Sequence, residues 1–448
     1  MSSDPITMAE LRLHVPQSSE PELVGWLSQV GDNIRVSFSP QYVANPLRPT
    51  LSTLYKGAND EQTRAILTAV NDERLVRIGR LPSYFSNLLP EGHNRERLAE
   101  RRGVATSDEF QLLAAAGHDL LGALEVLPAH DVPTSVIELH ATKNLEPVEA
   151  WAVAAPTEDG FSLGGVVEKF SMVHDGHRYV IRRGTEAGEF IGKLPSTRFP
   201  DLVDNEATCY RLAEAVGVHH AGGEARPIEE LGIAVKLPEE FTHYLHVRRF
   251  DRMRLDGGTV KRVHFEELAQ AVGIDPRNKY KNINAGMVSL LKMLKASPAS
   301  SIREQEEVFR RWTMFSLMGG TDAHLKNWAI GYPDGIHPSL APAYDLVCVS
   351  CYFDPNDPQQ LAQNRAMDRA IRLWNEDAAA ALARDAGILQ VNRMRKVVRD
   401  TALLAAKEWP AILASAPDRL RVEVTARLKE LVVRKPPTAT STKIAPRT

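Results

Sequence analysis

The residue types with the clearest chemical potential lie in residues 321–327, TDAHLKN, and in Tyr344-Asp345 after a short Pro- and Gly-containing interval. Phosphoryl transfer requires one carboxylate that orients or accepts the proton of the attacking hydroxyl. It also requires an amide oxygen and a second carboxylate that hold Mg²⁺ on the phosphates. Asp322, Asn327 and Asp345 supply this set. The same triplet is common in loops, because Asp and Asn side chains hydrogen-bond their own backbone, so the surrounding elements must decide.

A glycine pair upstream could contact an anion. Gly164 and Gly165 lie between β-forming residues in the stretch 160–170, GFSLGGVVEKF. Backbone N–H groups of such a turn can face a phosphate, and Lys169 adds a point charge. The stretch matches neither a Walker A motif nor G-x-G-x-x-G, so a Gly-Gly hairpin turn is the alternative. One strand later, Lys193 either reaches the α/β phosphates or is a strand-edge charge.

Two helices are expected to position these groups. The first, from Asp204 as cap to Val216, carries Glu206 in its first turn, where a carboxylate is favourable beside the helix dipole. Glu206 could instead form an ion pair that positions Lys193. The second helix, 301–318, has a continuous apolar stripe and ends at a glycine pair. Asp322 is therefore expected on a loop that leaves a packed helix.

Composition places few restrictions on the function. The 448 residues carry 54 basic and 57 acidic side chains, for a net charge of −3, so no global attraction to nucleic acid or membrane is expected. The three cysteines, Cys209, Cys348 and Cys351, are too few for a disulfide framework. We expect buried free thiols rather than a zinc site. With no signal peptide or apolar span in view, the cytoplasm is the expected location.

The pattern of expected strands and helices changes several times along the chain and predicts five segments. The order is a flexible N-terminus, a small α+β unit, a strand-rich unit with the glycine pair, a helical unit and a disordered tail. Their boundaries are 1–20, 21–128, 129–261, 262–435 and 436–448. Within the helical unit, a local basic run is either a solvated helix face or a contact with DNA phosphates. Its members are Arg393, Arg395, Lys396 and Arg399.

The order of these motifs resembles the HipA family of bacterial serine/threonine kinases, toxins of type II toxin-antitoxin modules. The resemblance covers roughly residues 20 to 435. It rests first on residues 321–327 with Tyr344-Asp345. The further matching motifs are Ser162 to Lys169, Lys193 to Pro195, Val203 to Glu206, Arg249 to Arg252, Asn87 to Gly92 and Arg95 to Leu98.

The resemblance implies an α+β, two-lobed protein-kinase-like fold with an N-terminal α/β subdomain and a helical C-terminal lobe. It implies ATP and Mg²⁺ as cofactors, Asp322 as the catalytic base, and Asn327 and Asp345 as metal ligands. Ser162 matches the family's autophosphorylation site, where a phosphate would add negative charge beside those of ATP. The implied nucleotide-binding residues are Gly164, Gly165, Val166, Val167, Glu168, Lys169, Lys193, Arg248, Arg249, Phe250, His324, Leu325, Lys326, Asn327, Tyr344, Asp345, Leu346 and Val347.

The resemblance also implies partners. These are a small helix-turn-helix antitoxin similar to HipB, a protein substrate in translation such as an aminoacyl-tRNA synthetase, and DNA only through the antitoxin complex. No membrane contact is implied. Two departures stand out: Arg248 replaces a common Glu before Arg249-Phe250, and Val166-Val167 replace small or amide residues. The β-branched pair is expected to stiffen the glycine loop.

Two other classes of function remain open from the sequence. A catalytically weak kinase-like chain could act as a co-repressor that holds an antitoxin on DNA. Alternatively, Asp-x-His-x-x-Asn resembles the catalytic loop of phosphoinositide kinases, which would give a lipid or small-molecule kinase. No basic amphipathic helix or lipid anchor supports membrane work.

Overall fold

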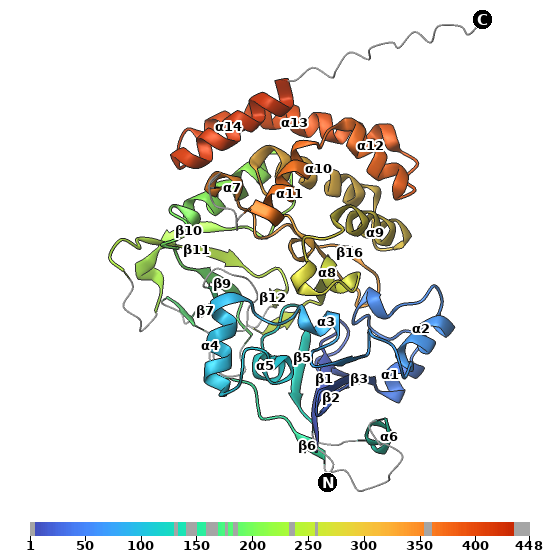
Figure 1. Cartoon of the computed structure of the whole chain (residues 1–448). Coiled ribbons are helices and arrows are strands. Elements are labelled where there is room, and N and C mark those ends of the chain that lie inside the picture. Colours follow the sequence, from blue (N-terminus) through green and yellow to red (C-terminus); the bar gives the residue numbers. More distant parts are fainter. Residues whose placement is uncertain are drawn as a thin grey trace, which may run out of the picture.

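The computed structural model has three parts (Figure 1). A sheet-based N-terminal part lies at the bottom of the view, a second sheet lies at the left, and a helical part forms the top. The structure describes residues 5–129, 133–139, 150–157, 169–174, 178–181, 187–232, 238–255, 259–353 and 361–433.

The N-terminal sheet has six strands in the order β4-β3-β2-β1-β5, with β6 also paired to β1. A two-residue loop at Gly31, whose φ is 52°, closes the hairpin between β2 and β3. The strands are β1 (Ile6–Leu13), β2 (Glu22–Val30), β3 (Asn33–Phe38), β4 (Val76–Ile78), β5 (Leu124–Pro128) and β6 (Ala150–Ala152).

Two expected boundaries change. Residues 1–20 were expected to be flexible, but Ile6–Leu13 form the largely buried strand β1. Strand β6 changes the boundary expected at residue 128. Residues after 128 were expected to belong to the second unit, but Ile6 to Met8 of β1 pair in parallel with β6. The N-terminal sheet therefore recruits residues 150–152. A strand of three residues between unperiodic flanks gives little sequence signal, because its existence depends on a free edge of β1.

Helices cover the N-terminal sheet and build its core. Their apolar faces bury residues such as Phe85, Leu98 and Phe110 against the strands. Helix α4 ends at Gly103 with φ of 72°, the left-handed conformation that favours glycine after a helix. The helices are α1 (Pro40–Ala44), η1 (Thr53–Tyr55), α2 (Asp60–Leu67), α3 (Ser83–Ser86), α4 (Gly92–Arg102), α5 (Glu109–Ala116) and α6 (Thr134–Glu138).

The second sheet has the order β10-β11-β9-β7-β8 and carries both candidate lysines. Lys169 at the start of β7 is opposite Lys193 at the end of β9 in the antiparallel register. Helix α7 begins at Leu202, two residues before the expected cap at Asp204, and packs on β10 and β11. The elements are β7 (Lys169–His174), β8 (Tyr179–Ile181), β9 (Phe190–Lys193), α7 (Leu202–Ala215), β10 (Glu224–Pro227), η2 (Ile228–Glu230) and β11 (His243–Arg248).

After β11 the chain crosses into the helical part through short strands. The sequence pattern of residues 265–272 predicts a helix, but residues 265–267 form β14, because they pair with β15. The elements of this stretch are β12 (Arg252–Arg254), β13 (Val260–Arg262), β14 (Phe265–Glu267), α8 (Leu268–Ala271), η3 (Pro276–Asn278), α9 (Ile283–Ala296), α10 (Ile302–Met318), η4 (Leu325–Asn327), β15 (Ala329–Gly331) and β16 (Ser339–Leu340).

The largest core of the molecule lies in the helical part. Helix α10 contributes Phe309, Trp312 and Phe315 to this core, as its apolar stripe predicts. It ends at Gly319 with φ of 75°. The remaining elements are η5 (Ser350–Tyr352), α11 (Leu361–Arg372), α12 (Glu376–Asp385), α13 (Val391–Leu413) and α14 (Asp418–Val433).

The three cysteines are free thiols, as expected. Cys209 and Cys348 are buried and Cys351 is partly buried. Cys348 lies in an irregular segment that precedes η5. Within the described part of the chain, no group of three His, Cys, Asp or Glu residues could hold a metal ion. No helix among the described residues is long and apolar enough to cross a membrane.

Candidate active site

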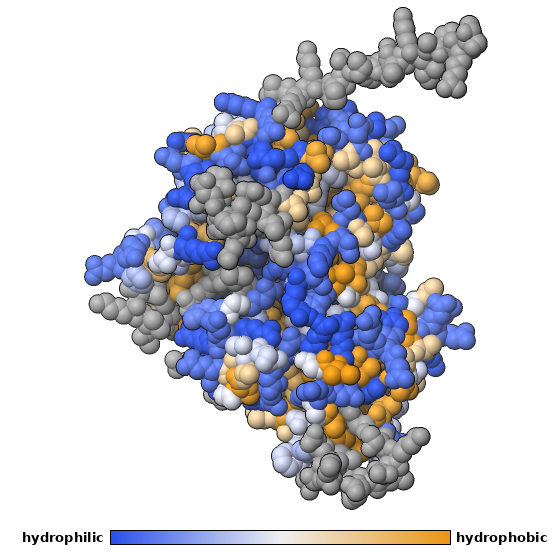
Figure 2. Space-filling model, in the orientation of Figure 1, coloured by the Kyte–Doolittle hydropathy of each residue, from blue (hydrophilic) through white to orange (hydrophobic). Residues whose placement is uncertain are grey.

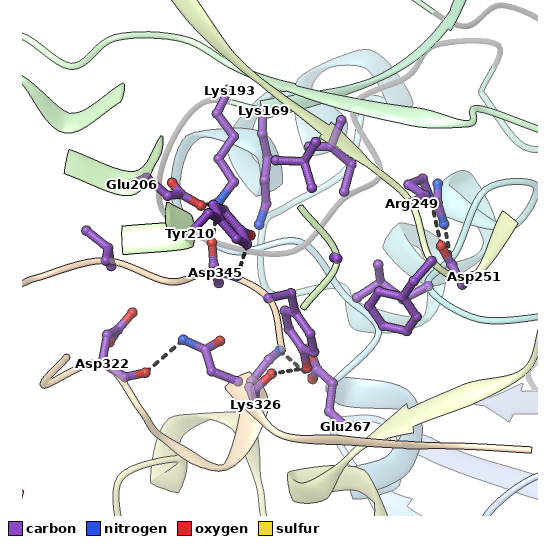
Figure 3. A pocket seen from close by; sticks show the side chains of 18 of the residues that line it. Lys169, Lys193, Glu206, Tyr210, Arg249, Asp251, Glu267, Asp322, Lys326 and Asp345 are labelled. Carbon is purple, nitrogen blue, oxygen red and sulfur yellow. Dashed lines mark hydrogen bonds and ion pairs between the residues drawn. The ribbon is translucent and has the colours of Figure 1, made fainter. Parts of the chain in front are cut away.

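A cleft between the second sheet and the helical part brings together most of the residues expected to do chemistry (Figure 3). Hydrophilic side chains cover much of the middle of the visible molecular face (Figure 2). In the close-up, Lys193, Lys169, Glu206 and Asp345 lie on one side of the cleft, and Asp322 and Lys326 on the other. These residues come from β7, β9, α7 and two loops of the helical part.

Asp322 lies on the loop that leaves α10, as the sequence predicts. Its Oδ1 accepts a hydrogen bond from the Tyr280 hydroxyl, and the same oxygen lies 3.6 Å from Nε2 of His324. The Asp322 side chain is 35% exposed, so it reaches the open cleft. Asn327 donates from Nδ2 to the backbone oxygen of Asp322 at 2.7 Å. Its amide oxygen is therefore the end that remains to accept a donor or bind a cation.

Asp345 shares Lys193 with a second carboxylate. Lys193 Nζ lies 2.5 Å from Oε1 of Glu206 and also contacts Oδ1 of Asp345. The ion pair considered for Glu206 from the sequence is thus present. Asp345 adopts φ of 57°, a left-handed conformation that Asp tolerates better than most residues. Its backbone N–H donates to the Tyr210 hydroxyl at 3.2 Å.

Burial and the two lysines set the charges at this end of the cleft. Burial alone would raise the pKa of Asp345, but the ammonium groups of Lys193 and Lys169 hold it well below its usual range. Burial would lower the pKa of Lys193, but the two carboxylates raise it above its usual value. Asp345 is therefore an anion and Lys193 a cation at neutral pH.

Lys326 links the 321–327 loop to the N-terminal part. Its Nζ donates to the backbone oxygen of Asn87 at 2.9 Å and lies 3.1 Å from Glu91 and 3.5 Å from Glu267. Burial raises the pKa of Glu267 to about 7. For Glu91, burial acts in the same direction, but Lys326 and Lys279 lower its pKa to about 2. Lys326 thus lines the cleft with its stem and anchors the loop with its charge.

The segment after β11 lines another wall of the cleft. Arg248 is exposed and lines the cleft, whereas the Arg249 side chain turns into the interior and binds Asp119 and Asp251. The Phe250 ring packs against Phe265 and Tyr344, with centroid distances of 4.7 and 5.6 Å. Arg249 lines the cleft, but its guanidinium group is bound to two buried carboxylates, so contact of this residue with a nucleotide stays a prediction.

Some predicted binding residues do not face the cleft. Leu325 and Leu346 are buried in the hydrophobic core, with 1% and 0% exposure, so apolar packing decides their direction. By contrast, His324, Asn327, Tyr344, Asp345 and Val347 line the cleft. The predicted residues Ser162, Gly164, Gly165, Val166, Val167 and Glu168 lie outside the described residues.

Sequence reasoning missed several residues that touch the predicted ones. Most come from distant segments outside any motif named above, so nothing in the local pattern marked them. Glu91 and Asp251 had a signal, because they lie in the Asn87 to Gly92 and Arg249 to Arg252 stretches that supported the resemblance. The missed residues are Glu91, Asp119, Tyr210, Asp251, Glu267, Lys279 and Tyr280.

The basic run on α13 is balanced by acidic neighbours. Each of its four charges pairs with a carboxylate from α10, α12 or α13 itself. A helix face paired in this way presents little excess positive charge, so contact with DNA stays a prediction without structural support. The pairs are Arg393 with Glu306, Arg395 with Asp377, Lys396 with Asp400, and Arg399 with Glu376.

Comparison with known proteins identifies the family. The HipA-like C-terminal domain matches residues 161–409, and the HipA N-terminal domain matches residues 18–127. The chain belongs to the HipA family. Its curated relatives include the putative kinase Y4dM of Sinorhizobium fredii, which is 31% identical over 415 residues, 91% of each chain.

Two further comparisons relate the chain to HipA itself. The serine/threonine-protein kinase toxin HipA of Shewanella oneidensis is 29% identical over 308 residues, which cover 62% of this chain and 65% of that protein. The solved structure of HipA with HipB and operator DNA from Shewanella oneidensis MR-1 superposes with a TM-score of 0.64 at 21% identity. It covers 95% of this chain and 96% of that chain. The expected family and the α+β kinase-like HipA fold are both confirmed.

Proposed function

We propose that this HipA-family chain is an ATP- and Mg²⁺-dependent protein kinase that phosphorylates Ser or Thr. The observation that carries the proposal is the convergence of Asp322, Asn327, Lys193 and Asp345 on one cleft, although they lie on separate segments. Phosphoryl transfer is catalysed mainly by positioning and charge stabilisation, and these four side chains are the types it requires.

The apolar end of the cleft suits a nucleobase. Aromatic and aliphatic side chains line it, including Phe250, Phe265, Tyr344, Val247 and Ile191. Among the described residues, the backbone N–H and C=O of Phe250 have no hydrogen-bond partner. Free backbone groups beside a flat apolar slot can read the edge of a base while the rings pack on its faces.

The charged end suits phosphates and a divalent cation. Lys193 and Lys169 are neighbours across β7 and β9 and place two ammonium groups at this end. The carboxylate of Asp345 and the amide oxygen of Asn327 are hard oxygen donors of the kind that Mg²⁺ prefers. When bound, Mg²⁺ neutralises part of the phosphate charge. Glu206 keeps Lys193 paired when Asp345 serves the cation, so the lysine retains its position.

Asp322 would take the proton from the acceptor hydroxyl. Its carboxylate is partly exposed at the cleft, whereas the adjacent His324 is buried. Burial lowers the pKa of His324 to about 4, so this imidazole is neutral at physiological pH and leaves the Asp322 charge uncompensated. A positioned carboxylate of this type contributes about 10²- to 10⁴-fold to a proton-coupled step.

The experiment incubates the purified full chain with labelled ATP, Mg²⁺ and a bacterial lysate, beside an Asp322→Ala variant. We expect label in protein Ser or Thr, and incorporation about 10²- to 10⁴-fold lower in the variant. Label in lipid, or equal incorporation by both proteins, would overturn the proposal. Mass spectrometry of the labelled chain tests autophosphorylation at Ser162, and mass spectrometry of the labelled lysate tests a translation component as substrate.

A second candidate function is that of a co-repressor. The solved HipA relative is in complex with HipB and its operator DNA, which supports a HipB-like antitoxin as partner of this chain. Co-purification with the product of a neighbouring helix-turn-helix gene tests this pairing. If the complex shifts operator DNA while the free chain does not, DNA contact occurs through the antitoxin. If the chain binds DNA alone, the basic run on α13 is the first surface to substitute.

A further inference from the structure

Tyr280, in the loop between η3 and α9, leaves Asp322 with two unequal oxygens. The Tyr280 hydroxyl donates to Oδ1. Among the described residues, no hydrogen bond reaches Oδ2, and the Asp322 side chain is 35% exposed. One oxygen of the carboxylate is therefore held from the protein side, and the other is open to the cleft.

The Tyr280 ring is fixed by its neighbours. It meets His324 edge-on, with a centroid distance of 4.9 Å and an interplanar angle of 85°. Burial raises the pKa of the Tyr280 hydroxyl, and the Asp322 charge raises it further, so the phenol keeps its proton at physiological pH. A neutral phenol facing a carboxylate can only donate, which gives the contact a single direction.

The loop that carries Tyr280 is tied to two other segments. Lys279, the preceding residue, forms a 2.7 Å ion pair with Glu91 of the N-terminal part. The Lys279 backbone oxygen accepts from the N–H of Leu325 in the catalytic loop at 3.1 Å. On the other side, Asn282 adopts φ of 57° and α9 begins one residue later. Tyr280 is thus held between an anchored residue and a helix start.

We propose that Tyr280 is a positioning residue for Asp322, whose hydroxyl holds Oδ1 so that Oδ2 faces the acceptor hydroxyl. The inference rests on the proposed kinase function. A carboxylate without this contact can rotate about its side-chain bonds and spends less time in the productive orientation. The Glu91 to Lys279 ion pair makes the N-terminal part a contributor to the same alignment.

The test compares Tyr280→Phe with the wild-type chain. The substitution removes one hydroxyl and keeps the ring that packs on His324. We expect kcat for phosphate transfer to fall about ten- to hundredfold, as for loss of a hydrogen bond to an ionised group. The KM for ATP and the affinity for a non-hydrolysable ATP analogue should stay unchanged. The matched control is Tyr55→Phe, which loses a hydroxyl bond to Arg74 in the N-terminal part and should keep the wild-type kcat.

A second readout separates positioning from general damage to the fold. In an Asp322→Asn background, Tyr280→Phe should reduce the residual rate no further, because Tyr280 acts only through the Asp322 carboxylate. An unchanged or increased kcat in Tyr280→Phe, or an equal further loss in the Asp322→Asn background, would overturn the inference. If the wild-type chain itself transfers no phosphate, the proposed function fails instead, so the two failures are distinguishable.

Discussion

Two groups of charged side chains near the cleft use the same chemistry in opposite ways. The closed cluster consists of Arg249, Arg252, Asp119 and Asp251, whose side chains are at most 3% exposed. The open cluster consists of Lys193, Glu206 and Asp345. Lys193 and Glu206 are similarly buried, but the Asp345 side chain is 31% exposed. Both clusters are ion-paired, so pairing alone does not distinguish structure from function.

The two clusters differ in whether their charged groups remain accessible to a further binding partner. In the closed cluster, Arg249 and Arg252 bind both carboxylates and also donate to the backbone oxygen of Leu120, at 3.2 and 3.0 Å. These bonds fasten the N-terminal part to the segment after β11. In the open cluster, Asp345 reaches the cleft. Solvent access to a charged oxygen, more than the density of charge, therefore marks the functional group.

The largest effect on stability should come from the closed cluster. Asp119→Asn leaves two guanidinium groups with a single buried carboxylate, and we expect the free energy of unfolding to fall by about 3–5 kcal/mol. Urea denaturation measures the loss. The matched control, Asp345→Asn, should cost less, because Lys193 keeps Glu206 as a partner and Asp345 is partly hydrated.

The effects of these two substitutions on activity should have the opposite order to their effects on stability. We expect Asp345→Asn to abolish most phosphate transfer while Asp119→Asn, assayed where it is folded, keeps most of it. Equal losses of stability in the two variants, or a larger loss in Asp345→Asn, would show that the distinction between the clusters is wrong.

A change of pH should act on both regions through buried histidines. His264 lies beside the N-terminal part, and His324 lines the cleft. Burial lowers the pKa of each to about 4. The unfolded chain protonates histidine near pH 6.5, so the free energy of unfolding should fall as pH decreases from about 6.5 to 4. Each histidine contributes on the order of 3 kcal/mol over this window.

His264 offers the cleaner measurement of this slope. Its Nε2 donates to the backbone oxygen of Leu51 at 2.8 Å, and its Nδ1 accepts from the N–H of Ala123 at 3.4 Å. Protonation would turn that acceptor into a donor facing another donor. His264→Gln should therefore flatten the dependence of stability on pH, measured by urea titrations from pH 7 to 4. An unaltered slope would contradict the assignment.

The smallest effect should come from exposed pairs. Arg395 of α13 forms a 2.7 Å pair with Asp377, and both side chains are solvent-accessible. Arg395→Ala should change the free energy of unfolding by about 1 kcal/mol or less, since water and side-chain entropy offset most of such a pair. Thermal denaturation at low and high salt checks this. A loss comparable to that of Asp119→Asn would contradict the view that burial sets the scale.

The sequence predicted the residues of the cleft better than those of the closed cluster. Asp322, Asn327 and Asp345 line the cleft and are recognisable because their residue types and spacing match those required for phosphoryl transfer. The roles expected for Lys193 and Glu206 came from the order of the motifs along the chain. The helix 301–318 was also correct to within one residue, because a long apolar stripe that stops at a glycine is typical of a packed helix.

The parts that were missed depend on tertiary contacts. Tyr280 and Glu91 are ordinary loop and turn residues until folding brings them to Asp322 and Lys326. Arg249 was placed by analogy, and its direction was decided by Asp119, which is 130 positions away in the chain. Strand β6 exists only because β1 offers an edge. Such contacts carry no local signature that a single sequence could reveal.

The contacts between the two family domains make the stability of each depend on the other. Glu266 of the C-terminal domain binds Ser52 at 2.5 Å and the Thr53 backbone at 2.8 Å. Together with the contacts of Lys326 and Arg249, it relies on partners that the N-terminal domain supplies. A chain shortened to the C-terminal domain would lose these contacts and expose their charged and polar groups to solvent, although Arg249 would keep Asp251 and Lys326 would keep Glu267. The second domain is therefore expected to be less stable without the first.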